Sequence, residues 1–167
     1  GWAAAFSTPF KMFKRYSEYA GGTCDPLVIS WPKGIKARGE VRNQYHHSTE
    51  LVATIVDICG LEMPNVYQRG EQKPIEGVSM RYSFDARPDG KTRKKRQYYA
   101  MLGTRGIWEN GWKAVSVHAP ISGKGHFDKD EWELYHVDKD RSESVNLAKK
   151  YPDRLKTLIK TWFEEAK

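Results

Sequence analysis

The sequence predicts an α+β fold in which a small antiparallel sheet, of about three to four strands, packs against a C-terminal helix. Three strand-like runs, residues 97–102, 112–118 and 132–137, are separated by turns that contain Gly, Asn and Asp. A helix is expected after them, because Pro152 suits a first helical position and apolar residues recur at i, i+3, i+4 and i+7. These apolar residues are Leu155, Leu158, Ile159 and Trp162.

The first thirty residues predict a loop followed by a strand. Residues 1–23 mix aromatic residues with lysines, without a helical period or strict alternation, which favours an ordered loop. Residues 26–32, PLVISWP, are apolar and β-branched at their centre and end at Pro32, with Gly34 just beyond. This pattern is typical of a strand buried inside a sheet.

A helix is predicted from Ser48 or Thr49, either of which can act as the N-cap, to Cys59. Gly60 suits the position after the helix, and Pro64 prevents its continuation. The helix has one apolar face, formed by Leu51, Ile55, Ile58 and Cys59. Residues 62–94 contain prolines, glycines and scattered charges, so we expect an extended connection with little regular structure.

The composition narrows the class of protein without selecting a function. Lys and Arg number 28 against 21 Asp and Glu, and the resulting net charge of +7 favours anionic partners of every kind. No apolar run approaches the roughly 20 residues that span a bilayer, and no signal peptide is recognised. Because the first residue is not Met, the chain is expected to begin inside a longer protein. Its compartment, cytoplasmic or periplasmic in a bacterium, stays open.

A search for catalytic motifs finds no complete constellation. Cys24 and Cys59 have no zinc-binding spacing, so buried free thiols are expected. His46 and His47 favour a packing role before the helix over metal ligation, because no third ligand lies at a suitable spacing. The basic run 91–96, followed by two tyrosines, is the best argument for a nucleic-acid-binding module, although a solvated loop explains it as well.

Five phrases, in order along the chain, resemble the C-terminal portion of sulfatases of the alkaline-phosphatase-like superfamily, and of bacterial arylsulfatases in particular. The first is residues 19–35, YAGGTCDPLVISWPKGI, which resembles the family pattern Y-E-G-G-x-x-x-P-x-x-x-x-W-P-x-x-I. The others are residues 46–64 (HHSTELVATIVDICGLEMP), 77–79 (GVS), 105–113 (RGIWENGWK) and 132–148 (WELYHVDKDRSESVNLA). The resemblance covers nearly the whole chain.

The resemblance implies that residues 1–75 end the catalytic α/β domain, contributing its last strand and helix, and that residues 76–167 form a C-terminal subdomain. It also implies a sulfuric ester hydrolase with a formylglycine nucleophile and a calcium ion. Neither cysteine stands in the formylglycine motif, since no arginine follows Cys24 at the required position. The nucleophile and the calcium ligands are therefore expected in the N-terminal part of the same enzyme, and this chain alone is expected to be inactive. An apolar face should be exposed where that part is missing.

One active-site residue of the family should lie in this chain, a lysine upstream of the first phrase that contacts the sulfate group. Aligned from Pro9, this residue is Lys14; counted back from Gly21, it is Arg15, and Lys11 is a further candidate. Ala20 replaces the usual glutamate of the phrase. An ordinary surface lysine is the alternative interpretation of Lys14. Residues 23–25 and the loop 119–127 are weaker candidates for approaching the substrate.

Overall fold

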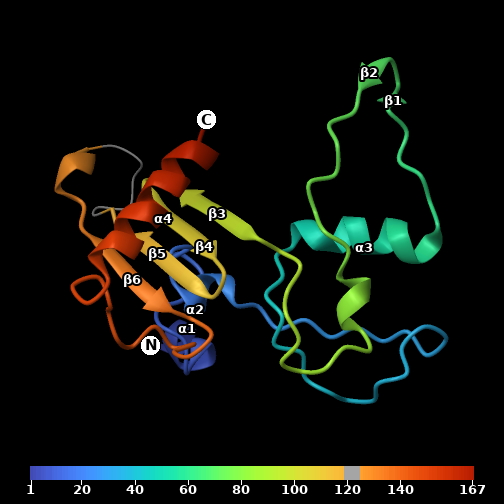
Figure 1. The fold of residues 1–167 in the computed structure, drawn as a ribbon, viewed down its shortest axis with the longest axis horizontal. Coiled ribbons are helices and arrows are strands. Elements are labelled where there is room, and N and C mark those ends of the chain that lie inside the picture. The colour runs from blue at the N-terminus through green and yellow to red at the C-terminus, as the bar shows by residue number, and fades with distance from the viewer. Residues whose placement is uncertain (119–124) are drawn as a thin grey trace. The chain divides into compact units, whose positions relative to one another are not determined.

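The computed structural model describes residues 1–118 and 125–167, which form two compact units. The first unit combines Gly1–Leu27 with Arg96–Lys167, and the second is Val28–Lys95 (Figure 1). This grouping differs from the predicted division at residue 75, because the N-terminal segment packs on the C-terminal sheet. That residues 1–75 end a catalytic domain stays a prediction.

A four-stranded antiparallel meander forms the centre of the first unit. Its strands are β3 (Arg96–Met101), β4 (Thr104–Glu109), β5 (Trp112–Ser116) and β6 (Trp132–His136), and they lie in the order of the sequence. Strand β4 was not among the three predicted runs, although the total agrees with the predicted three to four strands. Asn110 and Gly111 both have positive φ in the two-residue turn between β4 and β5, the conformation that favours this dipeptide in tight hairpins.

Helix α4 (Pro152–Glu165) covers one face of this sheet, as predicted (Figure 1). Pro152 is at the start of the helix, and Leu158 and Trp162 are buried against strand residues. The indole nitrogen of Trp162 also donates a hydrogen bond to the carbonyl of Tyr99 at 3.0 Å. The core on this face consists of Ile107, Ala114, Leu134, Leu158 and Trp162.

The opposite face of the sheet is covered by the N-terminal segment. Successive strand residues point to opposite faces, so Val115 and Tyr135 lie on the other side from Ala114 and Leu134. There they pack against Tyr19 in a second buried cluster. The prediction of a loop over residues 1–23 was wrong in part, since α1 (Trp2–Ser7) and the single-turn α2 (Ala20–Thr23) are helical. The three alanines at 3–5 have the highest intrinsic helix propensity, which explains α1.

A buried ion pair fixes the end of this segment. Lys113 on β5 contacts Glu143 at 2.8 Å, with both side chains almost fully buried. The other carboxylate oxygen of Glu143 accepts a hydrogen bond from the backbone N–H of Ala20 at 2.7 Å. Glu18 is also fully buried, and no described residue donates a well-formed hydrogen bond to its carboxylate. Burial therefore raises the pKa of Glu18.

The second unit contains the predicted helix, α3 (Thr49–Cys59), with Ser48 as its N-cap and Gly60 in the left-handed conformation after it. The following connection has little regular structure, as predicted. It holds only the two-residue strands β1 (Val66–Tyr67) and β2 (Gly70–Glu71) and the 3₁₀ turn η1 (Met80–Ser83). None of the helices among the described residues combines the length and apolar character needed to cross a membrane.

The predicted buried strand over residues 26–32 was wrong for this chain. These residues form no strand, and Leu27 and Val28 are 54% and 90% exposed. The physical reason is that a strand needs a partner for its backbone groups, and no described segment pairs with this one. Helix α3 likewise leaves apolar side chains exposed, among them Val52 and Ile55.

The second unit as a whole has almost no apolar core. Of its large apolar side chains, all of which the structure describes, only Met80 and Phe84 are buried. Eleven are exposed: Val28, Ile29, Val41, Leu51, Val52, Ile55, Leu61, Met63, Val66, Tyr67 and Ile75. Because burial of apolar surface is the main favourable term in folding, such a unit requires a partner surface. The predicted exposed apolar face is therefore confirmed.

Replacement of Trp162 tests the packing of α4. Trp162→Ala should lower the free energy of unfolding by about 3–5 kcal/mol, because it removes a large buried side chain and leaves a cavity. Phe163→Ala, one residue further on at a 51% exposed position, should have a much smaller effect. Urea unfolding followed by Trp fluorescence and circular dichroism measures both, and equal effects would contradict the assigned helix face.

Glu18→Gln tests the cost of the buried carboxylate. The pKa of Glu18 is raised in the folded state, so the protonated form of its carboxyl favours folding. This contribution to stability is fully present below the unfolded pKa and is lost as pH rises through the folded pKa. Glu18→Gln should therefore raise the free energy of unfolding at pH 7–8 by about 1 kcal/mol, and the melting temperature should rise with it. The gain should shrink near pH 4, where the carboxyl is protonated. A gain that is independent of pH would show that charge is not the cause.

Candidate functional site

The three predicted cationic residues lie on one closed loop, residues 11–19, on the face of the sheet opposite α4. The backbone N–H of Gly21 donates to the carbonyl of Lys11 at 2.8 Å and closes the loop. Two tight turns lie within it. The backbone N–H of Tyr16 donates to the carbonyl of Phe13 at 2.8 Å, and the backbone N–H of Tyr19 donates to the carbonyl of Tyr16 at 3.0 Å. The loop is therefore held by its own backbone as well as by the sheet.

Lys11 is bound to the sheet, where a carboxylate compensates its charge. Its ammonium group lies 3.3 Å from Glu133 and 2.9 Å from the hydroxyl of Tyr135, both on β6. It also lies over the ring of Tyr19, 4.0 Å from the ring centroid, in a cation–π contact. The structure thus gives Lys11 a structural role.

Glu133 is the centre of this cluster. Its Oε2 atom accepts hydrogen bonds from Tyr19 at 2.7 Å and Tyr135 at 2.6 Å, in addition to the contact with Lys11. Burial alone would raise the pKa of Glu133, but the tyrosine hydroxyls and the charge of Lys11 prevail and lower it. Burial and the adjacent carboxylate raise the pKa values of both tyrosines. Glu133 is therefore ionised at neutral pH, with both phenols protonated.

Lys14 and Arg15 occupy the middle of the loop, and both are exposed. Neither makes a hydrogen bond or ion pair with any residue in 1–118 or 125–167. An uncompensated cation can contact an anionic ligand without first breaking an internal ion pair. Of the three candidates, Lys14 and Arg15 are therefore the ones with no compensating carboxylate among the described residues.

The weaker candidates are less informative. Thr23 donates to the carbonyl of Tyr19 at 3.1 Å. Cys24 and Cys59 are free thiols, but both are exposed, so the prediction that they are buried was wrong. The loop 119–127 lies mostly outside the described residues, which resume at Gly125. No group of three or more His, Cys, Asp or Glu side chains in the described part of the chain is arranged to hold a metal ion.

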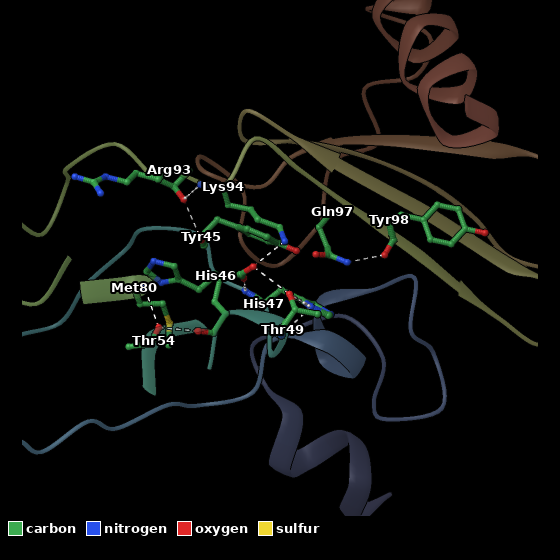
Figure 2. A network of polar contacts seen from close by, with 12 residues as sticks. Tyr45, His46, His47, Thr49, Thr54, Met80, Arg93, Lys94, Gln97 and Tyr98 are labelled. Carbon is green, nitrogen blue, oxygen red and sulfur yellow. Dashed lines mark hydrogen bonds and ion pairs between the residues drawn. The ribbon is translucent and has the colours of Figure 1, made fainter. Parts of the chain in front are cut away.

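A separate polar network lies in the second unit, around the start of α3 (Figure 2). The buried carboxylate of Glu50 pairs with Lys94 at 2.8 Å and also accepts hydrogen bonds from the backbone of His47 and the hydroxyl of Thr49. His46 lies 3.0 Å from the hydroxyl of Tyr82. Burial lowers the pKa of both histidines, which keeps them neutral at pH 7. These contacts agree with the packing role that the sequence predicted.

Several side chains of the basic run 91–96 have partners within the protein. Lys94 is committed to Glu50, and the guanidinium of Arg93 lies 4.6 Å from the centre of the Tyr82 ring. Within the first unit, Arg96 forms ion pairs with Glu109 and Glu165, both at 2.9 Å. Three of the five cations in the run therefore already have partners, which weakens the case for a phosphate-binding surface.

The sequence analysis missed Glu133 and the two tyrosines as parts of the site. Lys11 and Glu133 are 122 positions apart, so no local motif could join them. One signal was present: Glu133 and Tyr135 alternate with Trp132 and Leu134, which places them together on one face of a strand. The N-terminal segment covers that face.

Comparison with known proteins finds sulfatases. The chain is 28% identical, over 96% of its length, to an uncharacterised sulfatase of Schizosaccharomyces pombe, of which it covers 28%. It is 27% identical, over 81% of its length, to N-acetylglucosamine-6-O-sulfatase of Bacteroides thetaiotaomicron, of which it covers 24%. No protein-family model matches the chain.

Solved structures give the same result. A structure from work on glycosaminoglycan metabolism by Bacteroides thetaiotaomicron matches 89% of this chain and 30% of its own, with a TM-score of 0.65 and 18% identity. A second, solved in complex with D-glucosamine-2-N,6-O-disulfate, matches 84% of this chain and 27% of its own, with a TM-score of 0.56 and 25% identity. The chain thus resembles sulfatases in sequence and in fold, and it spans less than a third of the length of the proteins that it resembles.

Proposed function

We propose that the complete protein containing this chain is a sulfuric ester hydrolase, and that this chain contributes one sulfate contact from the loop 11–19. The observation that carries the proposal is the pair of exposed cations, Lys14 and Arg15, on a loop anchored to the sheet of a sulfatase homologue. Lys14 is our first choice, as the aligned residue, and Arg15 is the alternative.

The role proposed for Lys14 is electrostatic. Cleavage of a sulfate ester spreads negative charge over the sulfuryl oxygens and the departing oxygen, and a fixed ammonium group stabilises that charge. A lysine acts there as a point charge, whereas an arginine would offer a planar fork of donors. The products are an alcohol or phenol and sulfate.

The remaining chemistry is assigned to the N-terminal part of the same enzyme. A calcium ion does not fit the described residues of this chain, which offer no cluster of three ligands, so we derive no step through it. The formylglycine nucleophile is likewise proposed to lie outside this chain. We accordingly propose that the chain alone is inactive.

The apolar surface of the second unit supports this division of the enzyme. The relatives are three to four times longer than this chain, and we propose that the rest of the complete polypeptide covers this surface. We propose that residues 26–32 pair with a strand of that part and that α3 packs its exposed face on the resulting sheet. The predicted strand would then form only in the complete protein.

The substrate class is proposed from the relatives. One is an N-acetylglucosamine-6-O-sulfatase, and one solved structure holds a disulfated glucosamine. A sulfated amino sugar is therefore a candidate beside the aryl sulfate suggested by the sequence. A stand-alone module that binds nucleic acid is the alternative function, and it requires affinity for DNA, RNA or heparin that falls steeply with salt.

Lys14→Ala in the complete enzyme should lower turnover by about one to two orders of magnitude, the effect of losing a charged transition-state contact. Hydrolysis of 4-nitrophenyl sulfate and of N-acetylglucosamine-6-sulfate measures it. Lys129→Ala is a matched control on the C-terminal part of the chain and should leave turnover unchanged. Normal turnover in Lys14→Ala with a loss in Arg15→Ala would transfer the role, and normal turnover in both would refute the assignment.

Val28→Asp tests whether the apolar surface of the second unit is covered. In the isolated chain Val28 is 90% exposed, so the substitution should change stability by less than about 0.5 kcal/mol. In the complete protein the new carboxylate would be buried, with an expected loss of several kcal/mol. Val145→Asp, at a 58% exposed position of the first unit, is the control. Equal, small effects of Val28→Asp in both proteins would argue against the proposed docking.

A further inference from the structure

We infer that Glu133 is a positioning residue, which acts on the proposed reaction by holding the loop 11–19 so that its free cations face the sulfate group. The inference rests on the proposed function. It concerns how the sulfate contact is kept in place and adds a residue that touches neither the ester nor the nucleophile.

The geometry of the loop gives the first argument. Lys11 and Tyr19 are the two ends of the loop, and both contact the same carboxylate oxygen of Glu133. A loop whose two ends meet at one half-buried acceptor loses most of its freedom to slide along the sheet. Lys14 and Arg15 lie between these ends and are thereby presented from a fixed base.

The distribution of charge gives the second argument. The loop carries three cations close together, and Glu133 compensates the one nearest the sheet. Without that carboxylate, Lys11 would become a third uncompensated cation, able to compete for the same anion from a different position. Glu133 therefore separates a structural lysine from the cations that remain available to a ligand.

The strand that carries Glu133 gives the third argument. Glu133 is paired across the sheet with the buried Val115, and Tyr135 with the buried Lys113. Ser17, in the same loop, makes an independent contact with the hydroxyl of Thr104 at 3.1 Å. The loop thus keeps a second attachment, and loss of the Glu133 contacts should displace its middle without unfolding the unit.

The test is a double-mutant cycle in the complete enzyme, with kcat, KM and the inhibition constant of inorganic sulfate as readouts. The cycle combines Glu133→Gln with alanine at whichever of Lys14 and Arg15 proves to contact sulfate. Glu133→Gln alone should lower kcat/KM by roughly tenfold and weaken inhibition by sulfate. In the alanine background it should change kcat/KM by less than about threefold, because the group that it positions is gone.

Two further variants keep the test informative. Tyr135→Phe removes two hydrogen bonds, the one donated to Glu133 and the one accepted from Lys11, but keeps the carboxylate and its ion pair with Lys11. It should therefore produce a smaller loss of the same kind, and it serves if Glu133→Gln does not fold. Glu131→Gln removes an exposed charge two residues away and should leave every constant unchanged.

The outcomes separate the two claims. If alanine at Lys14 and Arg15 leaves kcat/KM unchanged, the proposed sulfate contact is wrong. Suppose instead that one of those alanines lowers kcat/KM. If Glu133→Gln then has no effect, or causes the same fold-loss of kcat/KM with and without that alanine, the sulfate contact stands and the positioning role of Glu133 is refuted. An unchanged inhibition constant for sulfate in Glu133→Gln refutes that role as well.

Discussion

The ion pair between Lys113 and Glu143 is the interaction on which the arrangement of the first unit depends. It is almost fully buried, and a buried pair of this kind is stable only when its remaining donors and acceptors are satisfied. Glu143 meets this requirement by accepting the backbone N–H of Ala20, which lies 123 positions earlier in the chain, and so joins the N-terminal segment to the sheet. Removal of either partner would leave an uncompensated charge against the strand and release the segment.

With this attachment, the sheet is covered by α4 on one face and by the N-terminal segment on the other. Helix α4 buries an apolar face of ordinary character, with Trp162 and Leu158 in its core. The other face is polar at its centre, where Lys113, Glu133 and Tyr135 meet the segment from Lys11 to Ala20. One face thus provides stability, and the other holds the loop that carries Lys14 and Arg15. The proposed function follows from this second face.

The limits of sequence reasoning follow from the same division. Helices α3 and α4 were predictable, because Gly60 and Pro152 mark their ends and their apolar residues are periodic. Lys11 could not be separated from Lys14 and Arg15, since its partner lies on a strand 122 positions away. Residues 26–32 are apolar, as the sequence shows, but they form no strand. A strand needs the edge of another strand to pair with, and the described residues of this chain do not provide one. The interpretation of the basic run 91–96 changed because Glu50 neutralises Lys94.

A crystal structure of the complete protein with bound inorganic sulfate tests the central claim most directly. The account predicts that the ammonium group of Lys14, or the guanidinium of Arg15, lies within hydrogen-bonding distance of a sulfate oxygen, about 3 Å. It also predicts that Lys11 keeps its contact with Glu133. A sulfate ion bound elsewhere, with Lys14 and Arg15 both directed into solvent, would contradict it.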